Sequence, residues 1–348
     1  ITGLSSSDKV FDTTTNATVN GTAVLQSPIA AGSGSDTDGI PYSGDGIALS
    51  GTATGTFDSA NAGSRTVSFG GLSLTGSGSK ASNYSLTAHA TASQSISEKA
   101  VILSATKVYD GDNTLTGAEV TITTNTGETL NYSGATSSDA NVATTNKFIS
   151  SITLENNGGA LASNYYLPTL NFANAPVTIS SKSVQLSASK TYDGNNDLTG
   201  NITLSTGVGS ETLLYSGATA SSRNVTDANK FISAITILDA TDGSGGLITN
   251  YQLPTLDAAN APATISAKAI TISGLTSSDK IYDGTTNASV AGTASLQSAI
   301  SAGTGSTSDG KPYDVDSLTL VGTAVGAFND KDVSDATKVV FSGLSLSG

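Results

Sequence analysis

Four copies of one short motif divide this sequence into repeats of similar length. The motif is a lysine, a variable residue, a tyrosine or phenylalanine, and an aspartate that glycine follows in three of the four copies. The copies begin at Lys9, Lys107, Lys190 and Lys280. A period of roughly 80 to 100 residues is too long for one coil of a solenoid or one blade of a propeller. It suits one small β-sandwich domain per repeat.

Two further motifs recur between these copies and mark the borders of the repeats. Ile-Ser-x-Lys occurs at residues 96–99, 179–182 and 265–268, and Asn-Tyr-x-Leu occurs at residues 83–86, 164–167 and 250–253. The middle repeats share Tyr-Ser-Gly-Ala-Thr and Asn-Lys-Phe-Ile-Ser, whereas the outer repeats share Gly-Leu-Ser-Leu. We therefore predict four domains: 1–98 (type A), 99–181 (type B), 182–267 (type B) and 268–348 (type A, incomplete at its C-terminus). Because the last repeat stops before its final strands, we expect the parent chain to continue.

Short segments that alternate apolar and polar residues predict β-strands throughout the chain. Residues 101–105, 184–188 and 270–274 alternate in this way, and Asp-Gly pairs and Gly/Ser clusters separate the segments as turns. No stretch has the period of an amphipathic helix. We expect an all-β fold of tandem Ig-like β-sandwich domains in an elongated array. Since no flexible linker separates the repeats, four domains in series would form a rod of about 150 Å.

Composition excludes several classes of function. The 348-residue chain contains no cysteine and one histidine, His89, so it has neither a thiol nucleophile nor the ligands for a His-based metal cluster. We expect no enzymatic activity, and we expect His89 to lie at the surface. The formal net charge of −13 argues against a nucleic-acid partner. No apolar run reaches the ~18 residues of a membrane span, so membrane insertion is not expected.

Calcium is the strongest chemical hypothesis, although the fold requires no cofactor. Aspartate and asparagine at alternate positions of a loop can supply several of the about six to eight oxygens that calcium prefers. The candidate ligands are Asp193, Asn195, Asp197, Asp110, Asp112, Asp330, Asp332 and Asp335, with Asp314 and Asp316 as a further pair. The alternative is structural, because these residues also favour turns.

The recurring motifs have structural interpretations as well. Lys-x-Tyr-Asp-Gly predicts a tight turn after the first strand, in which the aspartate bonds the backbone and the tyrosine packs at the edge of the core. Asn-Tyr-x-Leu is similar to the tyrosine corner of Greek-key sandwiches, whose hydroxyl ties a loop. A sugar-stacking role for its tyrosines is the alternative.

Taken together, the motifs resemble the YDG and MBG repeat modules of very large bacterial surface adhesins, including filamentous-haemagglutinin-like proteins. The best matches are residues 280–286 with 321–328 and 342–346, and residues 9–15 with 50–57 and 83–86. The resemblance implies an extracellular location on the bacterial cell surface and a role as a stalk or spacer. It implies neighbouring repeats of the same polypeptide as partners, and it carries over no catalytic residues.

Two other functions remain open from the sequence. In the first, the chain is an adhesin module that binds host or bacterial glycans or matrix through Tyr42, Tyr313 or the loops around Asp314 and Asp330. In the second, the chain self-associates into a fibre or surface layer by strand donation.

Overall fold

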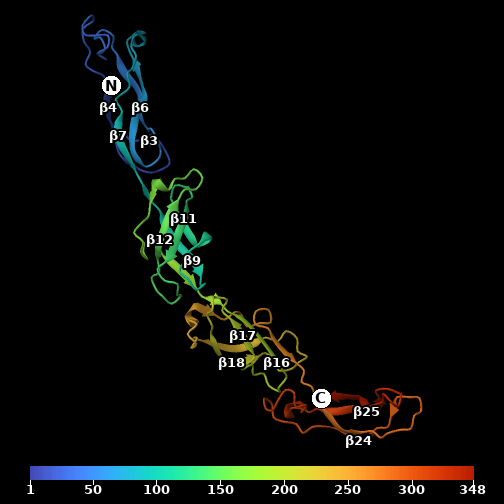
Figure 1. Ribbon diagram of the computed structural model, residues 1–348. Helices are drawn as coiled ribbons and strands as arrows, with labels where there is room; N and C mark the ends of the chain where they lie inside the picture. The colour runs from blue at the N-terminus through green and yellow to red at the C-terminus, as the bar shows by residue number, and fades with distance from the viewer. The chain divides into compact units, whose positions relative to one another are not determined.

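The computed structural model describes residues 1–348 and consists of strands joined by turns (Figure 1). Its only helical segments are five 3₁₀ turns of three or four residues. The predicted all-β class is therefore confirmed. The chain divides into two compact units, Ile1–Ser180 and Ser181–Gly348. Every strand pair joins strands of the same predicted repeat, while the four-domain division itself stays a prediction.

The first repeat has one sheet of two strands and one of five. Its elements are β1 (Thr2–Ser6), β2 (Lys9–Val10), β3 (Asn16–Ala17), β4 (Val19–Val24), β5 (Ala48–Phe57), β6 (Gly63–Thr75), η1 (Lys80–Asn83) and β7 (Ala92–Ser97). β1 pairs with β4, and the larger sheet has the order β2-β7-β6-β5-β3. The larger sheet buries Phe57 and Val67. His89 is half-buried, against our expectation of a surface position, because its ring packs edge-on against Phe69 and its Nε2 accepts a hydrogen bond from Leu4 N at 3.2 Å.

The two middle repeats share one topology. The second repeat contains β8 (Lys99–Ala100), β9 (Ile102–Val108), η2 (Gly117–Glu119), β10 (Val120–Thr123), β11 (Asn131–Ser137), β12 (Ile149–Glu155), η3 (Ala162–Asn164), β13 (Tyr165–Tyr166) and β14 (Val177–Ser180). The third contains β15 (Lys182–Ser183), β16 (Gln185–Thr191), β17 (Ile202–Ser205), β18 (Leu214–Ala220), β19 (Ile232–Leu238), η4 (Ile248–Asn250), β20 (Tyr251–Gln252) and β21 (Ala263–Ser266). Each has a three-stranded sheet (β10-β9-β14 or β17-β16-β21), an antiparallel pair (β11-β12 or β18-β19) and a short parallel pair (β13-β8 or β15-β20).

Alternation along one central strand explains which residues enter the core of a middle repeat. Successive side chains of a strand point to opposite faces. The buried residues are Leu103, Ala105 and Lys107 in β9 and Leu186, Ala188 and Lys190 in β16. The motif lysine therefore belongs to the same inward row as two apolar residues, and the strand carries its ammonium into the interior.

The fourth repeat has two sheets and less regular structure at its start. It contains β22 (Ile272–Thr276), β23 (Asn287–Ala288), β24 (Ala291–Leu296), η5 (Asp314–Asp316), β25 (Thr319–Phe328) and β26 (Val339–Ser347). β22 pairs with β24, and the second sheet has the order β23-β25-β26. Residues 268–269, which correspond in sequence to β8 and β15, lie outside any strand.

Glycines in close approach distinguish the outer repeats from the middle ones. The register of β5 and β6 shifts after Gly51, which pairs with Leu72 and approaches the backbone of Gly71. Both glycines have positive φ, and a Cβ on Gly51 would lie 2.4 Å from the carbonyl oxygen of Gly71. Gly322 and Gly343 form the equivalent pair in the fourth repeat. Only glycine fits this close approach, which accounts for the glycines that the type A repeats share.

Candidate functional site

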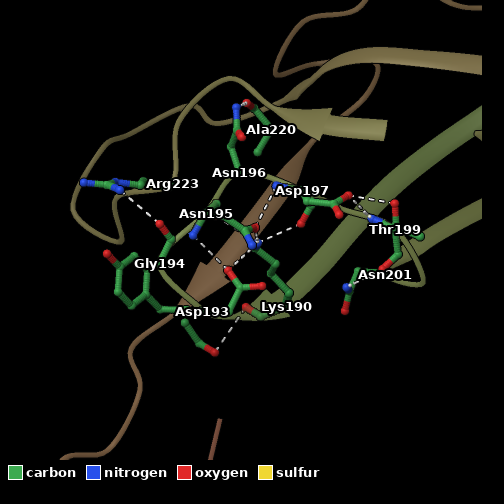
Figure 2. Close-up of polar contacts among 12 residues, drawn as sticks. Lys190, Asp193, Gly194, Asn195, Asn196, Asp197, Thr199, Asn201, Ala220 and Arg223 are labelled. Carbon is green, nitrogen blue, oxygen red and sulfur yellow. Dashed lines mark hydrogen bonds and ion pairs between the residues drawn. The ribbon is translucent and has the colours of Figure 1, made fainter. Parts of the chain in front are cut away.

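The lysine of the Lys-x-Tyr-Asp-Gly motif is the centre of a polar loop, which is clearest in the third repeat. Lys190 ends the inward row of β16, and its side chain is 3% exposed. Its Nζ donates hydrogen bonds to Asp193 Oδ1 (2.6 Å), to Asn195 Oδ1 (3.0 Å) and O (2.9 Å), and to Asp197 O (2.7 Å) (Figure 2). Four oxygens therefore surround one ammonium group.

Turns at alternate residues hold this loop in shape. Asp193 Oδ1 accepts a hydrogen bond from Asn195 N, and Asn195 Oδ1 accepts one from Asp197 N. Asp197 Oδ1 in turn accepts hydrogen bonds from the backbone and hydroxyl of Thr199. Asp and Asn side chains commonly bond the backbone two residues on. Their alternation in the sequence thus produces a series of turns around the lysine.

The second repeat builds the same loop with oxygens at the equivalent positions. Lys107 Nζ contacts Asp110 Oδ1 (2.7 Å) and Asp112 Oδ1 (2.9 Å), and it donates to Thr114 O (2.6 Å). The outer repeats bury the lysine less, since the exposed fraction of the side chain is 16% for Lys9 and 26% for Lys280, against 1% for Lys107. The type B loops are therefore the more enclosed pair.

The charges of these loops favour a structural role. Burial by itself lowers the pKa of Lys107, but the carboxylates of Asp110 and Asp112 outweigh this effect and raise it above its usual value. The bond from Lys280, followed by those from Thr285, lowers the pKa of Asp283 to about 2. Both shifts move the groups away from neutral pH, where a general acid or base would titrate.

The calcium candidates fall into two groups in the structure. The first group directs oxygens at a lysine ammonium. Its members are Asp110 and Asp112, whose side chains contact Lys107, and Asp193, Asn195 and Asp197, which contact Lys190, the last through its backbone carbonyl. Asp330, Asp332 and Asp335 form a separate turn, in which Asp332 accepts from Lys331 Nζ at 2.8 Å. No group of three or more acidic, histidine or cysteine side chains is arranged to hold a metal. Calcium binding stays a prediction, and an ion in the first group would have to displace the ammonium.

The tyrosine of Asn-Tyr-x-Leu ties a loop, as predicted. In each complete repeat its hydroxyl donates to a carboxylate of that repeat. The pairs are Tyr84 with Asp45 (2.6 Å), Tyr165 with Glu128 (2.5 Å) and Tyr251 with Glu211 (2.6 Å). The hydrogen bond to Asp45 raises the pKa of Tyr84.

The asparagine of the same motif joins the second repeat to the first. Asn164 is 2% exposed. Its Nδ2 donates to Asn61 Oδ1 (3.0 Å), and its Oδ1 accepts from Ala62 N (2.9 Å). Beside it, Phe11 packs edge-on against Tyr165 with ring centroids 5.3 Å apart. Phe11 is the aromatic residue of the Lys-x-Tyr-Asp-Gly position in the first repeat, which we expected at the edge of its own core; it is buried, and it contacts the next repeat as well.

A second joint lies within Ser181–Gly348, between the third and fourth repeats. Tyr192 OH donates to Asp316 Oδ1 at 2.5 Å, and its ring packs edge-on against Tyr313. Burial, followed by the bond to Asp316, raises the pKa of Tyr192 to about 12. A Cβ on Gly194 would lie 2.8 Å from Ala302 Cβ. The aromatic residue and the glycine of the motif thus both contact the following repeat.

Sequence reasoning missed the residues that receive these motifs. Asn61 was the main omission, and its local sequence gives no signal, because Asn-Ala occurs at 61–62 and also at 16–17, 174–175, 260–261 and 287–288. Asp45 and Glu128, which accept the tyrosine hydroxyls, stand in loops with no shared local pattern. Their role appears only when the chain is folded.

Comparison with known proteins gives a family and no closer relative. The structure has no helix that is long and apolar enough to span a membrane. No curated protein and no solved structure matches the chain. The model of the YDG domain matches residues 1–93, 97–172 and 266–348, which include both outer repeats and most of the second. With more than half of its length covered by this model, the chain belongs to the YDG domain family.

Proposed function

We propose that this chain is a non-enzymatic spacer of a large bacterial cell-surface or extracellular-matrix adhesin, with reach and mechanical stability as its contribution. Its domains are tandem Ig-like β-sandwiches, and their partners are the neighbouring repeats of the same polypeptide.

The joint at Asn164 is the observation that carries this proposal. Its buried amide both donates to Asn61 and accepts from Ala62, so the two hydrogen bonds define one orientation of the side chain. Only one residue separates β7, which ends at Ser97, from β8, which begins at Lys99. A short connection with directional bonds resists bending, whereas a Gly/Ser linker would behave as a random coil.

The electrostatics support the same function. The motif lysines and aspartates form ion pairs, and the pKa values of Lys107 and Asp283 are shifted away from neutral pH, as in loops that stabilise a fold. The net charge of −13 makes copies of the chain repel one another. An acidic spacer would therefore stay extended and dispersed.

Small-angle X-ray scattering of the full chain tests this function. We expect a maximum dimension near 150 Å, the length estimated from strand rise. Asn164→Ala should broaden the distance distribution, whereas Asn131→Ala, which removes an exposed amide whose hydrogen bond stays within the second repeat, should not. A compact particle of about half that length would rule out reach as the function. Release of the repeats by protease treatment of intact cells would test the surface location.

A further inference from the structure

One pocket in Ser181–Gly348 gathers the residue types that bind an Asn-Tyr-x-Leu segment elsewhere in the chain. Its volume is about 350 Å³, and its lining includes Asn224, Val225, Ile270, Tyr313 and Asp316. We propose that this pocket binds an extended peptide strand that carries Asn-Tyr-x-Leu. The proposal rests on the contacts alone and does not depend on a spacer role.

The first part of the pocket matches the binding site of the motif tyrosine. In the first repeat, Tyr84 OH donates to Asp45 Oδ2 (2.6 Å) and accepts from Tyr42 N (3.0 Å). Tyr313 and Asp316 have the same three-residue spacing as Tyr42 and Asp45, and both line the pocket. A carboxylate has about four lone-pair sites. Asp316 can therefore accept a second hydroxyl beside that of Tyr192.

The second part matches the binding site of the motif asparagine. Asn61 and Ala62 hold Asn164 at the first joint, and Asn224 and Val225 are their sequence equivalents in the third repeat. The local turns agree as well, because a serine two residues earlier accepts a hydrogen bond from the asparagine N in both. These bonds are Asn61 N to Ser59 Oγ (3.2 Å) and Asn224 N to Ser222 Oγ (3.0 Å). The pocket thus offers the same amide and backbone donor to an incoming asparagine.

The third part is the backbone at Ile270, two residues before β22. In the middle repeats the Asn-Tyr-x-Leu strand pairs in parallel with the start of the repeat, and the valine that follows donates to it. These bonds are Val101 N to Tyr166 O (3.2 Å) and Val184 N to Gln252 O (3.0 Å). Ile270 is the equivalent of these valines, and residues 268–269 belong to no strand. Addition of a strand to a sheet edge is a common mode of peptide recognition.

The aromatic residues of the pocket fit the same occupant. At the first joint, Phe11 packs edge-on against Tyr165, the motif tyrosine. Tyr192 stands at the position of Phe11 in the third repeat and lines the pocket. A bound tyrosine would therefore meet an aromatic neighbour. An oligosaccharide could stack on these rings, but it would leave the backbone N–H of Ile270 without a strand to pair with.

Binding of a synthetic peptide to the full chain tests the proposal. The probe is a fluorescent peptide with the sequence of residues 79–90, which contains Asn83 and Tyr84, and the readout is fluorescence anisotropy. We expect saturable binding that Asn83→Ala or Tyr84→Phe in the peptide weakens about tenfold each, as the loss of one good hydrogen bond predicts. Because these changes leave the protein untouched, folding of a protein variant does not affect the result.

Variants of the chain then locate the peptide. Asn224→Ala and Asp316→Asn should each weaken binding about tenfold, whereas Asn61→Ala, the same change at a joint that Asn164 already fills, should not. The proposal is overturned if the peptide does not saturate, if a scrambled peptide binds equally well, or if Asn224→Ala and Asp316→Asn leave the affinity unchanged. Binding of an oligosaccharide that depends on Asp316, with no binding of the peptide, would overturn it as well.

Discussion

Replacement of the enclosed lysine of the third repeat by methionine should destabilise the chain strongly. Lys190→Met keeps the length and most of the apolar stem but removes the ammonium that contacts four oxygens. Loss of one partner of a buried ion pair costs about 3–5 kcal/mol. The side chain of Asp193 is 24% exposed, so water can solvate it in the variant. We therefore expect the lower end of the range, about 3 kcal/mol.

The same motif supplies a matched control at lower burial. Lys280→Met removes the pair with Asp283, whose side chain is 53% exposed, and the lysine itself is 26% exposed. Pairs exposed to water contribute about 0.2–1 kcal/mol. The two substitutions are chemically identical, so the difference between their effects reports the fuller enclosure of Lys190 together with its larger set of oxygen partners.

Urea and thermal denaturation of the full chain, followed by circular dichroism, measure both variants. If Ser181–Gly348 unfolds as one unit, about 3 kcal/mol lowers Tm by roughly 6–12 °C, and by more if the third repeat unfolds alone. Hydrogen exchange should show the loss at Asn195 N and Asp197 N, which the loop holds. Equal destabilisation by Lys190→Met and Lys280→Met would refute the role given to burial, as would a loss below about 1 kcal/mol for Lys190→Met.

Three further predictions concern the joint, acid and calcium. Gly194→Ala should lower the stability of the third and fourth repeats by more than Gly284→Ala, because both have positive φ but only Gly194 abuts Ala302, and thermal denaturation compares them. Asp283, with its pKa lowered to about 2, should contribute stability above pH ~3.8 and lose it as the pH falls toward 2. The titration of Asp283 can be followed by NMR at the Thr285 amide, and its midpoint should move to higher pH in Lys280→Met. An unchanged midpoint would contradict the pairing. Millimolar calcium should raise the Tm of Lys190→Met by more than that of the native chain, since the ammonium no longer competes for the oxygens; an equal rise in both would place calcium elsewhere.

Local patterns predicted much of the fold because β-strands and turns are specified over a few residues. The alternation at 101–105 and 184–188 predicted β9 and β16, and Asp-Gly pairs predicted the turns that follow them. The tyrosine ties were also predictable, since Asn-Tyr-x-Leu has a known structural analogue. The contacts between repeats were not predictable in this way. Asn164 and Asn61 are 103 residues apart, and nothing in the neighbourhood of either residue indicates the other.

The oxygen-rich loops show why composition alone left their chemistry open. Aspartate and asparagine at alternate positions form consecutive turns, and such turns aim several oxygens at one point whether the occupant is a metal ion or an ammonium. In the third repeat the distinguishing residue is Lys190, which stands three residues before Asp193 on the inward row of β16. Its place in that row follows from the period of the strand, two residues after Ala188. A loop of this kind should therefore be assigned to lysine or calcium only after the phase of the preceding strand is known.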